Sequence, residues 1–182
     1  NRAVKPTCLR QAAYFRSLGY LQNALYAHTV MGCHLAHQTN FRTPRMLDHM
    51  TFRVTNISRA KAFYSAALAP LGYSVCFEGN YGSNMLGLAY PDASEPDGKK
   101  ADVWFIDGPS PYGGPTTTSG CHLAWRAKNR AQVDAFYKAA IAAGGKDNGA
   151  PGLRPDYHAN YYGAFVIDPE GNNIEAVCHL PE

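Results

Sequence analysis

The sequence predicts an α+β protein built from two tandem βαβββ modules. Three observations carry this prediction: an internal repeat, a strand followed by a helix at the start of each copy, and a similar turn before the last strand of each copy. The repeat appears when the chain is shifted against itself by 73 positions, which gives ten identities in 27 pairs, His49 with His122 among them. Ordinary composition gives roughly two identities in such a comparison. The two segments are therefore expected to fold as two copies of one unit.

The first module is expected to span residues 46–108. A strand over 47–54 precedes an Ala-rich stretch over 58–71 with the apolar spacing of a helix, and Gly72 ends it. Three further strands are expected, and the turn Glu95-Pro96-Asp97-Gly98 introduces the last of them; they cover residues 73–78, 84–90 and 101–106.

The second module, residues 119–182, repeats this order after a linker over 109–118. A strand and a helix come first, and two strands flank the turn Asp168-Pro169-Glu170-Gly171; these elements cover residues 121–127, 130–143, 162–167 and 173–178. The stretch 145–160 is rich in Gly and Pro. We therefore expect it to be largely loop and to act as a lid over a pocket.

Residues 1–45 precede the repeat and contain no acidic side chain. This Arg-containing segment is a dispensable extension, a packed accessory helix or a mitochondrial presequence, the last because presequences are basic and poor in acidic residues. The five cysteines include no CxxC pair, which favours reduced thiols in an intracellular compartment. The expected location is the cytoplasm, with the mitochondrion as the alternative if residues 1–45 are a presequence.

Charge and hydropathy argue against two classes of partner, nucleic acid and the membrane. Of the 17 basic side chains, six precede Asp48, so residues 48–182 carry 11 basic and 14 acidic groups. A body with that net negative charge is not expected to bind nucleic acid through a broad basic surface. No apolar stretch is suited to span a membrane, and the expected partner is a small-molecule substrate.

Strand alternation assigns the residues of the four main strands to two faces. One face is apolar and suits packing under the helices. The other face is polar and carries His49 and Asp102 in the first module and His122 and Glu175 in the second. If a pseudo-twofold axis relates the modules, these four side chains meet around one point, with Asp102 as the counterpart of Glu175.

Two imidazoles and two carboxylates are suitable donors for one divalent metal ion, such as zinc, nickel, manganese or iron(II). The predicted metal ligands are therefore His49, Asp102, His122 and Glu175. Such a metal polarises a carbonyl or enediolate oxygen while a carboxylate, Glu175, moves protons. Asp102 has a shorter side chain than Glu175, and its alternative role is a hydrogen bond to a ligand.

These residues resemble the vicinal oxygen chelate superfamily, which groups glyoxalase I, bleomycin-resistance proteins and extradiol dioxygenases. The resemblance covers roughly residues 46–180 and rests on LDHMTFRV at 47–54, AFYSAALAPLGY at 62–73, GCHLAWRA at 120–127, VDAFYKAAIAAGG at 133–145 and YYGAFVIDPEGNNIEAVCH at 161–179. It implies a half-open sheet cup around a metal with helices outside, ligands on the first and last strands of each module, and a homodimer. Glyoxalase I usually has Glu where Asp102 stands.

Further candidates lie near these ligands in the sequence. His158, Tyr161 and Tyr162 lie roughly where extradiol dioxygenases keep their acid/base His and a Tyr, so the resemblance implies catalytic roles for His158 and Tyr162 beside Glu175. Their alternative is a purely structural role. Candidates for holding an anionic substrate, or for stacking on a planar one, are Arg53, Arg126, Arg154 and Trp104.

Three functions follow from these features. The first is a glyoxalase-like metalloenzyme of the isomerase or lyase type, acting on a small substrate with adjacent oxygens. The second is an iron(II) extradiol-type dioxygenase with His49, His122 and Glu175 as its ligands. The third is a non-catalytic protein that sequesters a small molecule, as bleomycin-resistance proteins do. The four retained metal-binding residues argue against the third, and whether glutathione is used stays open.

Overall fold

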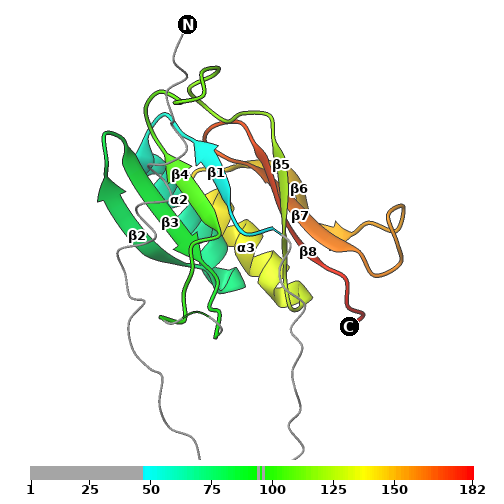
Figure 1. The fold of residues 1–182 in the computed structure, drawn as a ribbon. Coiled ribbons are helices and arrows are strands. Elements are labelled where there is room, and N and C mark those ends of the chain that lie inside the picture. The colour runs from blue at the N-terminus through cyan, green and yellow to red at the C-terminus, as the bar shows by residue number, and fades with distance from the viewer. Residues whose placement is uncertain (1–46, 94, 96) are drawn as a thin grey trace, which may run out of the picture. The chain divides into compact units, whose positions relative to one another are not determined.

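The computed structural model describes residues 47–93, 95 and 97–182 (Figure 1). The predicted extension over 1–45 lies outside these residues. The described part forms two four-stranded mixed sheets and two α-helices, which confirms the α+β class with two βαβββ modules. Within this part, no helix is long and apolar enough to cross a membrane.

The first module forms a sheet with the strand order β1-β4-β3-β2. Its elements are β1 (Met50–Arg53), α2 (Ile57–Leu68), a 3-10 turn (Ala69–Leu71), β2 (Ser74–Asn80), β3 (Asn84–Ala89) and β4 (Val103–Ile106). Helix α2 begins after Asn56, whose side chain accepts a hydrogen bond from the backbone of Arg59. Gly72 ends the following turn at φ +95°, a left-handed conformation that favours glycine. β1 and β4 pair in parallel, so the chain must cross over between them, and α2 lies in that connection.

The second module repeats this arrangement in the order β5-β8-β7-β6. Its elements are β5 (His122–Arg126), α3 (Arg130–Ala142), β6 (Lys146–Leu153), β7 (Tyr162–Ile167) and β8 (Asn173–Cys178). Asn129 caps α3 as Asn56 caps α2, by accepting from the backbone of Gln132. The repeat in the sequence is therefore a repeat of local structure.

The prediction of a loop over 145–160 is wrong for its first half, because residues 146–153 form β6. β6 is the outer strand of its sheet, where Pro151 need not donate to a second neighbour. Its pairing with β7 shifts register at two places, and Gly149 and Gly152 mark them. An edge position and local irregularity thus allow a strand in a segment whose composition indicated none.

The two modules share a hydrophobic core under the helices. Phe63 of α2, Phe105 of β4, Phe136 of α3 and Ile174 of β8 are all fully buried in it. The two helices contact each other (Figure 1). In β4 and β8, residues flanking Trp104 and Glu175 enter this core, so Trp104 and Glu175 themselves point to the opposite side. We call that side the open face of each sheet.

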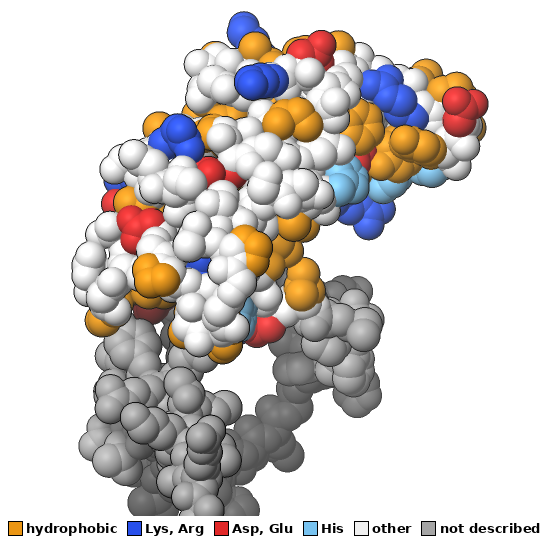
Figure 2. Space-filling view, turned by 90° about the horizontal axis from the view of Figure 1, so that it is seen from above, with side chains coloured by type: hydrophobic (Ala, Val, Ile, Leu, Met, Phe, Trp, Pro, Cys, Tyr) orange, Lys and Arg blue, Asp and Glu red, His pale blue; other side chains and the backbone are white. Residues whose placement is uncertain are grey.

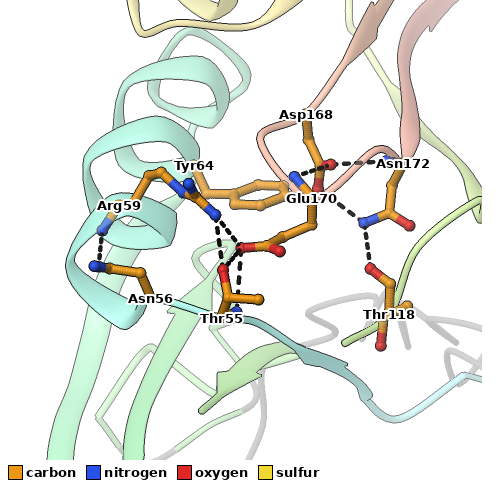
Figure 3. Close-up of polar contacts among 8 residues, drawn as sticks. All are labelled: Thr55, Asn56, Arg59, Tyr64, Thr118, Asp168, Glu170 and Asn172. Atoms are coloured by element: carbon orange, nitrogen blue, oxygen red, sulfur yellow. Dashed lines mark hydrogen bonds and ion pairs between the residues drawn. The ribbon is translucent and has the colours of Figure 1, made fainter. Parts of the chain in front are cut away.

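A buried polar network also joins the modules, at the turn between β7 and β8 (Figure 3). The Tyr64 hydroxyl of α2 donates to Oδ2 of Asp168 at 2.5 Å, and the Asn172 side chain donates to the same oxygen at 2.9 Å. The Asn172 side chain also donates to the carbonyl of Thr118, just before β5. Burial, and then the Asp168 carboxylate, raise the pKa of Tyr64 far above its usual value, so its hydroxyl stays a donor.

Glu170, in the same turn, contacts the start of α2. Its Oε1 accepts hydrogen bonds from the Thr55 backbone and hydroxyl at 3.1 and 2.8 Å and from the Arg59 guanidinium at 2.8 Å (Figure 3). Burial raises the pKa of Glu170, but these hydrogen bonds outweigh it and hold the pKa below its ordinary value. The predicted turn 168–171 is therefore a contact between modules as well as a link between strands.

Candidate functional site

The open face of the second sheet carries a histidine beside a buried carboxylate. His122 is the first residue of β5, and Glu175 lies in the middle of β8. His122 Nε2 is 3.2 Å from Glu175 Oε2, and the side chains are 52% and 1% exposed. Figure 2 shows several histidine side chains close together on one part of the surface, beside hydrophobic side chains, and another histidine apart from them. One partner of this pair is thus open to a ligand and the other is shielded from water.

The other oxygen of Glu175 is held by Tyr161. The Tyr161 hydroxyl donates to Glu175 Oε1 at 2.5 Å. Burial, and then the contact with Glu175, raise the pKa of Tyr161 well above its usual value, so the phenol stays protonated. Gly163 makes room for this contact, because a Cβ there would lie 3.0 Å from Glu175 Oε1 and 3.2 Å from the Tyr161 ring. Oε2 is left to face His122.

His122 is oriented from its other ring nitrogen by Asn173. Nδ1 lies 2.9 Å from the Asn173 side-chain nitrogen and 3.2 Å from the Asn173 carbonyl oxygen. Asn148 donates to the Asn173 side-chain oxygen at 3.1 Å, which turns the Asn173 nitrogen toward His122. If the Asn173 side chain donates to Nδ1, Nε2 carries the proton and can donate to Glu175. If Nδ1 instead donates to the Asn173 carbonyl, Nε2 presents a lone pair.

A second pair of histidines lies next to Tyr161. His158 Nε2 is 2.9 Å from His179 Nδ1, and the two rings stack with centroids 5.1 Å apart. The Tyr161 ring meets both edge-on, at 5.4 and 5.1 Å. The structure thus places His158, a predicted catalytic residue, in contact with the tyrosine that holds Glu175.

Tyr162, the other predicted catalytic residue, lies away from this site. Its hydroxyl donates to Oδ1 of Asp134 on α3 at 2.8 Å, and its ring packs under the Arg130 guanidinium at 5.1 Å. Neighbouring residues of a strand point to opposite faces, so Tyr162 faces the helix when Tyr161 faces Glu175. The tyrosine that contacts Glu175 is therefore Tyr161.

The two predicted ligands of the first module lie just outside their strands. His49 precedes β1, is exposed, and contacts Asp48 Oδ1 through Nδ1 at 2.7 Å. Asp102 precedes β4, and its Oδ2 accepts from the Tyr73 hydroxyl at 3.1 Å. Among residues 47–93, 95 and 97–182, no group of three His, Cys, Asp or Glu side chains could hold a metal ion. The predicted meeting of four ligands is therefore not found, and His122 and Glu175 are the pair that the structure brings together.

The registers of the two sheets explain part of this difference. Both sheets pair their first and last strands in parallel, with Met50 opposite Val103 and His122 opposite Asn173. The partner lies 53 positions ahead in the first sheet (103 − 50) and 51 in the second (173 − 122). A constant offset of 73 therefore does not hold for the last strands.

Trp104, not Asp102, is the counterpart of Glu175. Glu175 lies opposite Ala124, two residues after the histidine of the second module. The equivalent position in the first module is opposite Thr51, and Trp104 occupies it. The expected symmetry between Asp102 and Glu175 is wrong for this reason, and the first sheet carries an indole where the second carries a carboxylate.

The three predicted arginines have different surroundings. Arg154 lies on the open face of the second sheet, with its guanidinium 5.6 Å from the centre of the Phe165 ring and bonded to the Ala150 carbonyl at 2.7 Å. Phe165 lies directly opposite Glu175. Arg126 is exposed on β5, and Arg53 points toward the carbonyl of Pro109 at 3.3 Å. Arg126 is the nearest of the three to Glu175 in register, because it lies two residues beyond the direct partner of Glu175 on β5, whereas Arg154 reaches the same face through the Phe165 ring.

Sequence reasoning missed two residues of this site, His179 and Asn173. His179 continues the alternation that places Glu175 and Val177 on the open face, so the spacing of two residues could have found it. Asn173 precedes Glu175 by two residues, so the same alternation places it on the open face. A metal-ligand search overlooks an asparagine, because its role is to orient a ligand.

The comparisons with known proteins agree with this fold. A model of the glyoxalase/bleomycin resistance protein/dioxygenase superfamily matches residues 46–176. A glyoxalase/bleomycin resistance protein from Albidiferax ferrireducens T118 is 28% identical, with a TM-score of 0.54 over 75% of this chain and 100% of its own. A family enzyme from Burkholderia phytofirmans PsJN is 21% identical, with a TM-score of 0.51 over 74% of this chain and 98% of its own.

Glyoxalase I from Zea mays is similar in fold, at 16% identity and a TM-score of 0.51. The match covers 75% of this chain but 45% of the maize chain, so this protein corresponds to less than half of that length. The search of curated proteins found no match. The family model covers most of the chain, and the structure has the two βαβββ modules that the resemblance implied. The chain therefore belongs to the glyoxalase/bleomycin resistance protein/dioxygenase superfamily, the vicinal oxygen chelate superfamily.

Proposed function

We propose that this protein is a glyoxalase-like, metal-dependent enzyme that isomerises or cleaves a small substrate with two adjacent oxygens. The observation that carries the proposal is the His122–Glu175 pair, with Nε2 and Oε2 3.2 Å apart and the glutamate side chain 1% exposed. Burying a carboxylate is unfavourable unless hydrogen bonds or positive charge compensate it. Tyr161 compensates one oxygen, and a cation beside His122 would compensate the other.

The residues present fit a divalent metal in three respects. An imidazole nitrogen and a carboxylate oxygen are suitable donors for zinc, nickel, manganese or iron(II). The Asn173 carbonyl can accept from Nδ1 of His122, which leaves the Nε2 lone pair for a metal. Tyr161 fixes the orientation of the carboxylate. His49 and Asp102 are the further ligands that we propose from the first module; because the structure does not bring them to His122 and Glu175, they would have to approach this pair when the metal binds.

When bound, the metal supplies a Lewis acid that polarises a substrate oxygen. Glu175 is the proposed base, because its buried carboxylate is poorly solvated and has one oxygen, Oε2, directed at the exposed His122. Tyr161 stays protonated and holds Oε1, so it positions Glu175. His158 contacts Tyr161 and is proposed to exchange protons with solvent at the edge of the site. Arg154 and Arg126 are proposed to attract an anionic substrate.

The structural observation on Trp104 favours a second candidate function. Because an indole stands where a first-module carboxylate would be, the donors that remain at matching positions are His49, His122 and Glu175. Two histidines and one carboxylate are the ligand set of non-haem iron(II) oxygenases. An extradiol-type dioxygenase is therefore the alternative, and we include the expected homodimer in both proposals.

The test uses metal-stripped protein reloaded anaerobically with zinc, nickel, manganese or iron(II) in turn. The substrates are the hemithioacetal of methylglyoxal and glutathione, 2-hydroxy ketones and catechols, with oxygen uptake recorded for the catechols. We expect turnover of one substrate that depends on metal and is lost in Glu175→Gln.

Asp134→Asn is the matched control, because it neutralises an exposed carboxylate that also accepts from a tyrosine. Oxygen consumption with iron(II) alone would favour the dioxygenase. Equal turnover by metal-free protein, or by Glu175→Gln, would contradict the proposal.

A further inference from the structure

The open face of the first sheet carries a row of three aromatic rings, which we call the aromatic row: Trp104, Phe77 and Tyr81. The centroids of Trp104 and Phe77 are 5.3 Å apart, and those of Phe77 and Tyr81 are 6.3 Å apart with the rings nearly parallel at 19°. Phe77 lies opposite Gly87 of β3, which lies opposite Trp104 of β4. The row therefore crosses the sheet from β4 to its outer strand β2.

Two glycines lie directly beneath these rings. A Cβ at Gly79 would be 2.9 Å from the Phe77 ring and 3.2 Å from the Tyr81 ring, and a Cβ at Gly87 would be 3.2 Å from the Trp104 ring. Glycine inside a strand lowers stability, and it often marks a place where another group approaches the backbone closely. Here the approaching groups are aromatic rings, which lie close against the backbone of the sheet.

Trp104 and Phe77 of the row line an open cavity of about 410 Å³. Val75 and Ala101 add apolar side chains to its lining, and Cys76, Asp97 and Lys99 add polar ones. Sites for small molecules are commonly about 300–1,000 Å³ and combine aromatic rings with a few polar groups. Trp104 and Phe77 are half-buried, whereas Tyr81 is 63% exposed, so the row presents ring surface to a ligand.

We propose that the aromatic row is a binding site for a planar aromatic compound, which lies against Trp104 and Phe77 with its far edge near Tyr81. Stacked and tilted aromatic contacts favour a flat π-system over a saturated ring of equal size. This inference goes beyond the proposed reaction and does not require a metal. It gives a role to Trp104, which occupies in the first sheet the position that Glu175 occupies in the second.

The test compares 2-naphthol with decahydro-2-naphthol, which has the same carbon skeleton without the flat rings. Each is titrated by calorimetry into the metal-free, full-length protein. We expect 2-naphthol to bind about two- to tenfold more tightly, and Trp104→Leu or Tyr81→Leu to remove that preference. The chain has two tryptophans, and Trp125 is in the core at 6% exposure, so only the Trp104 indole N–H signal should shift in NMR spectra.

Tyr112→Leu is the matched control, because Tyr112 is 84% exposed on the linker, outside the row. Tyr81→Leu is included beside Trp104→Leu because the Tyr81 side chain is mostly in solvent, so its replacement should leave the protein folded. Equal affinity for the two naphthols, or equal losses in Tyr81→Leu and Tyr112→Leu, would overturn the inference. A change of oligomeric state in Tyr81→Leu with unchanged naphthol affinity would also overturn it and assign the row to a contact between copies. Retained naphthol binding in Glu175→Gln separates this site from the proposed reaction.

Discussion

Replacing Tyr64 with Phe tests the buried contact between the modules. The ring should stay in place, because it packs 4.2 Å from the Phe105 ring in the core, and the substitution removes the hydroxyl alone. That hydroxyl donates to Asp168 at 2.5 Å, with the two residues 1% and 5% exposed. A hydrogen bond to a charged group contributes about 1.5–3 kcal/mol. Asp168 keeps donors from Glu170 and Asn172, so the carboxylate is not left unpaired and the expected loss is about 2 kcal/mol.

The assay is urea denaturation, with thermal denaturation expected to show a fall in Tm of roughly 4–8 °C. Tyr162→Phe is the matched control, because its hydroxyl also donates to an aspartate, but at the exposed Asp134. Substitutions at such surface sites usually change stability by about 0.5 kcal/mol or less. Equal losses in the two variants would refute the reasoning that burial makes the Tyr64 contact strong.

Three further predictions concern the turn and the site. The pKa of Glu170 is lowered on folding, so its stabilising contribution is complete above its ordinary value of 4.5 and is lost as the pH falls through the lower, folded value. Glu170→Gln should therefore reduce the loss of stability that wild type shows below about pH 5, measured by urea denaturation. Tyr161→Phe should weaken metal binding by about 10- to 100-fold in calorimetry, because Glu175 loses the donor that orients it. Gly163→Ala should lower the free energy of unfolding by about 1–3 kcal/mol, because its methyl group would crowd Glu175 and Tyr161, and thermal denaturation checks it.

The elements of the fold could largely be predicted from the sequence, because local signals agree with the tertiary structure. The helical spacing of apolar residues, a Gly stop and the alternation along the strands predicted most helices and strands to within a few residues. β6 could not be predicted, because Pro151 and its neighbouring glycines are compatible with a strand only at a sheet edge. Edge position is a property of the sheet as a whole.

The candidate site could be predicted only in part. His122 and Glu175 came from strand alternation, and the structure places them 3.2 Å apart. The partner of Glu175 could not be chosen, because Tyr161 and Tyr162 are adjacent and the start of β7 decides which one faces it. Trp104 was predicted to contact a substrate, but its equivalence to Glu175 could not be predicted. That equivalence depends on a two-residue difference in register between the two sheets, which the sequence of a single strand does not show.

The measurement that tests the central claim most directly is the metal content of the full-length protein after reloading with each candidate metal and removal of excess, by elemental mass spectrometry. Wild type is compared with His122→Ala, Glu175→Ala and the control His158→Ala, which removes a nearby histidine outside the proposed ligand pair. We predict about one metal ion per chain in wild type and His158→Ala, and loss of that ion in the other two. Wild-type protein that takes up no metal, or equal metal content in all four proteins, would contradict the account.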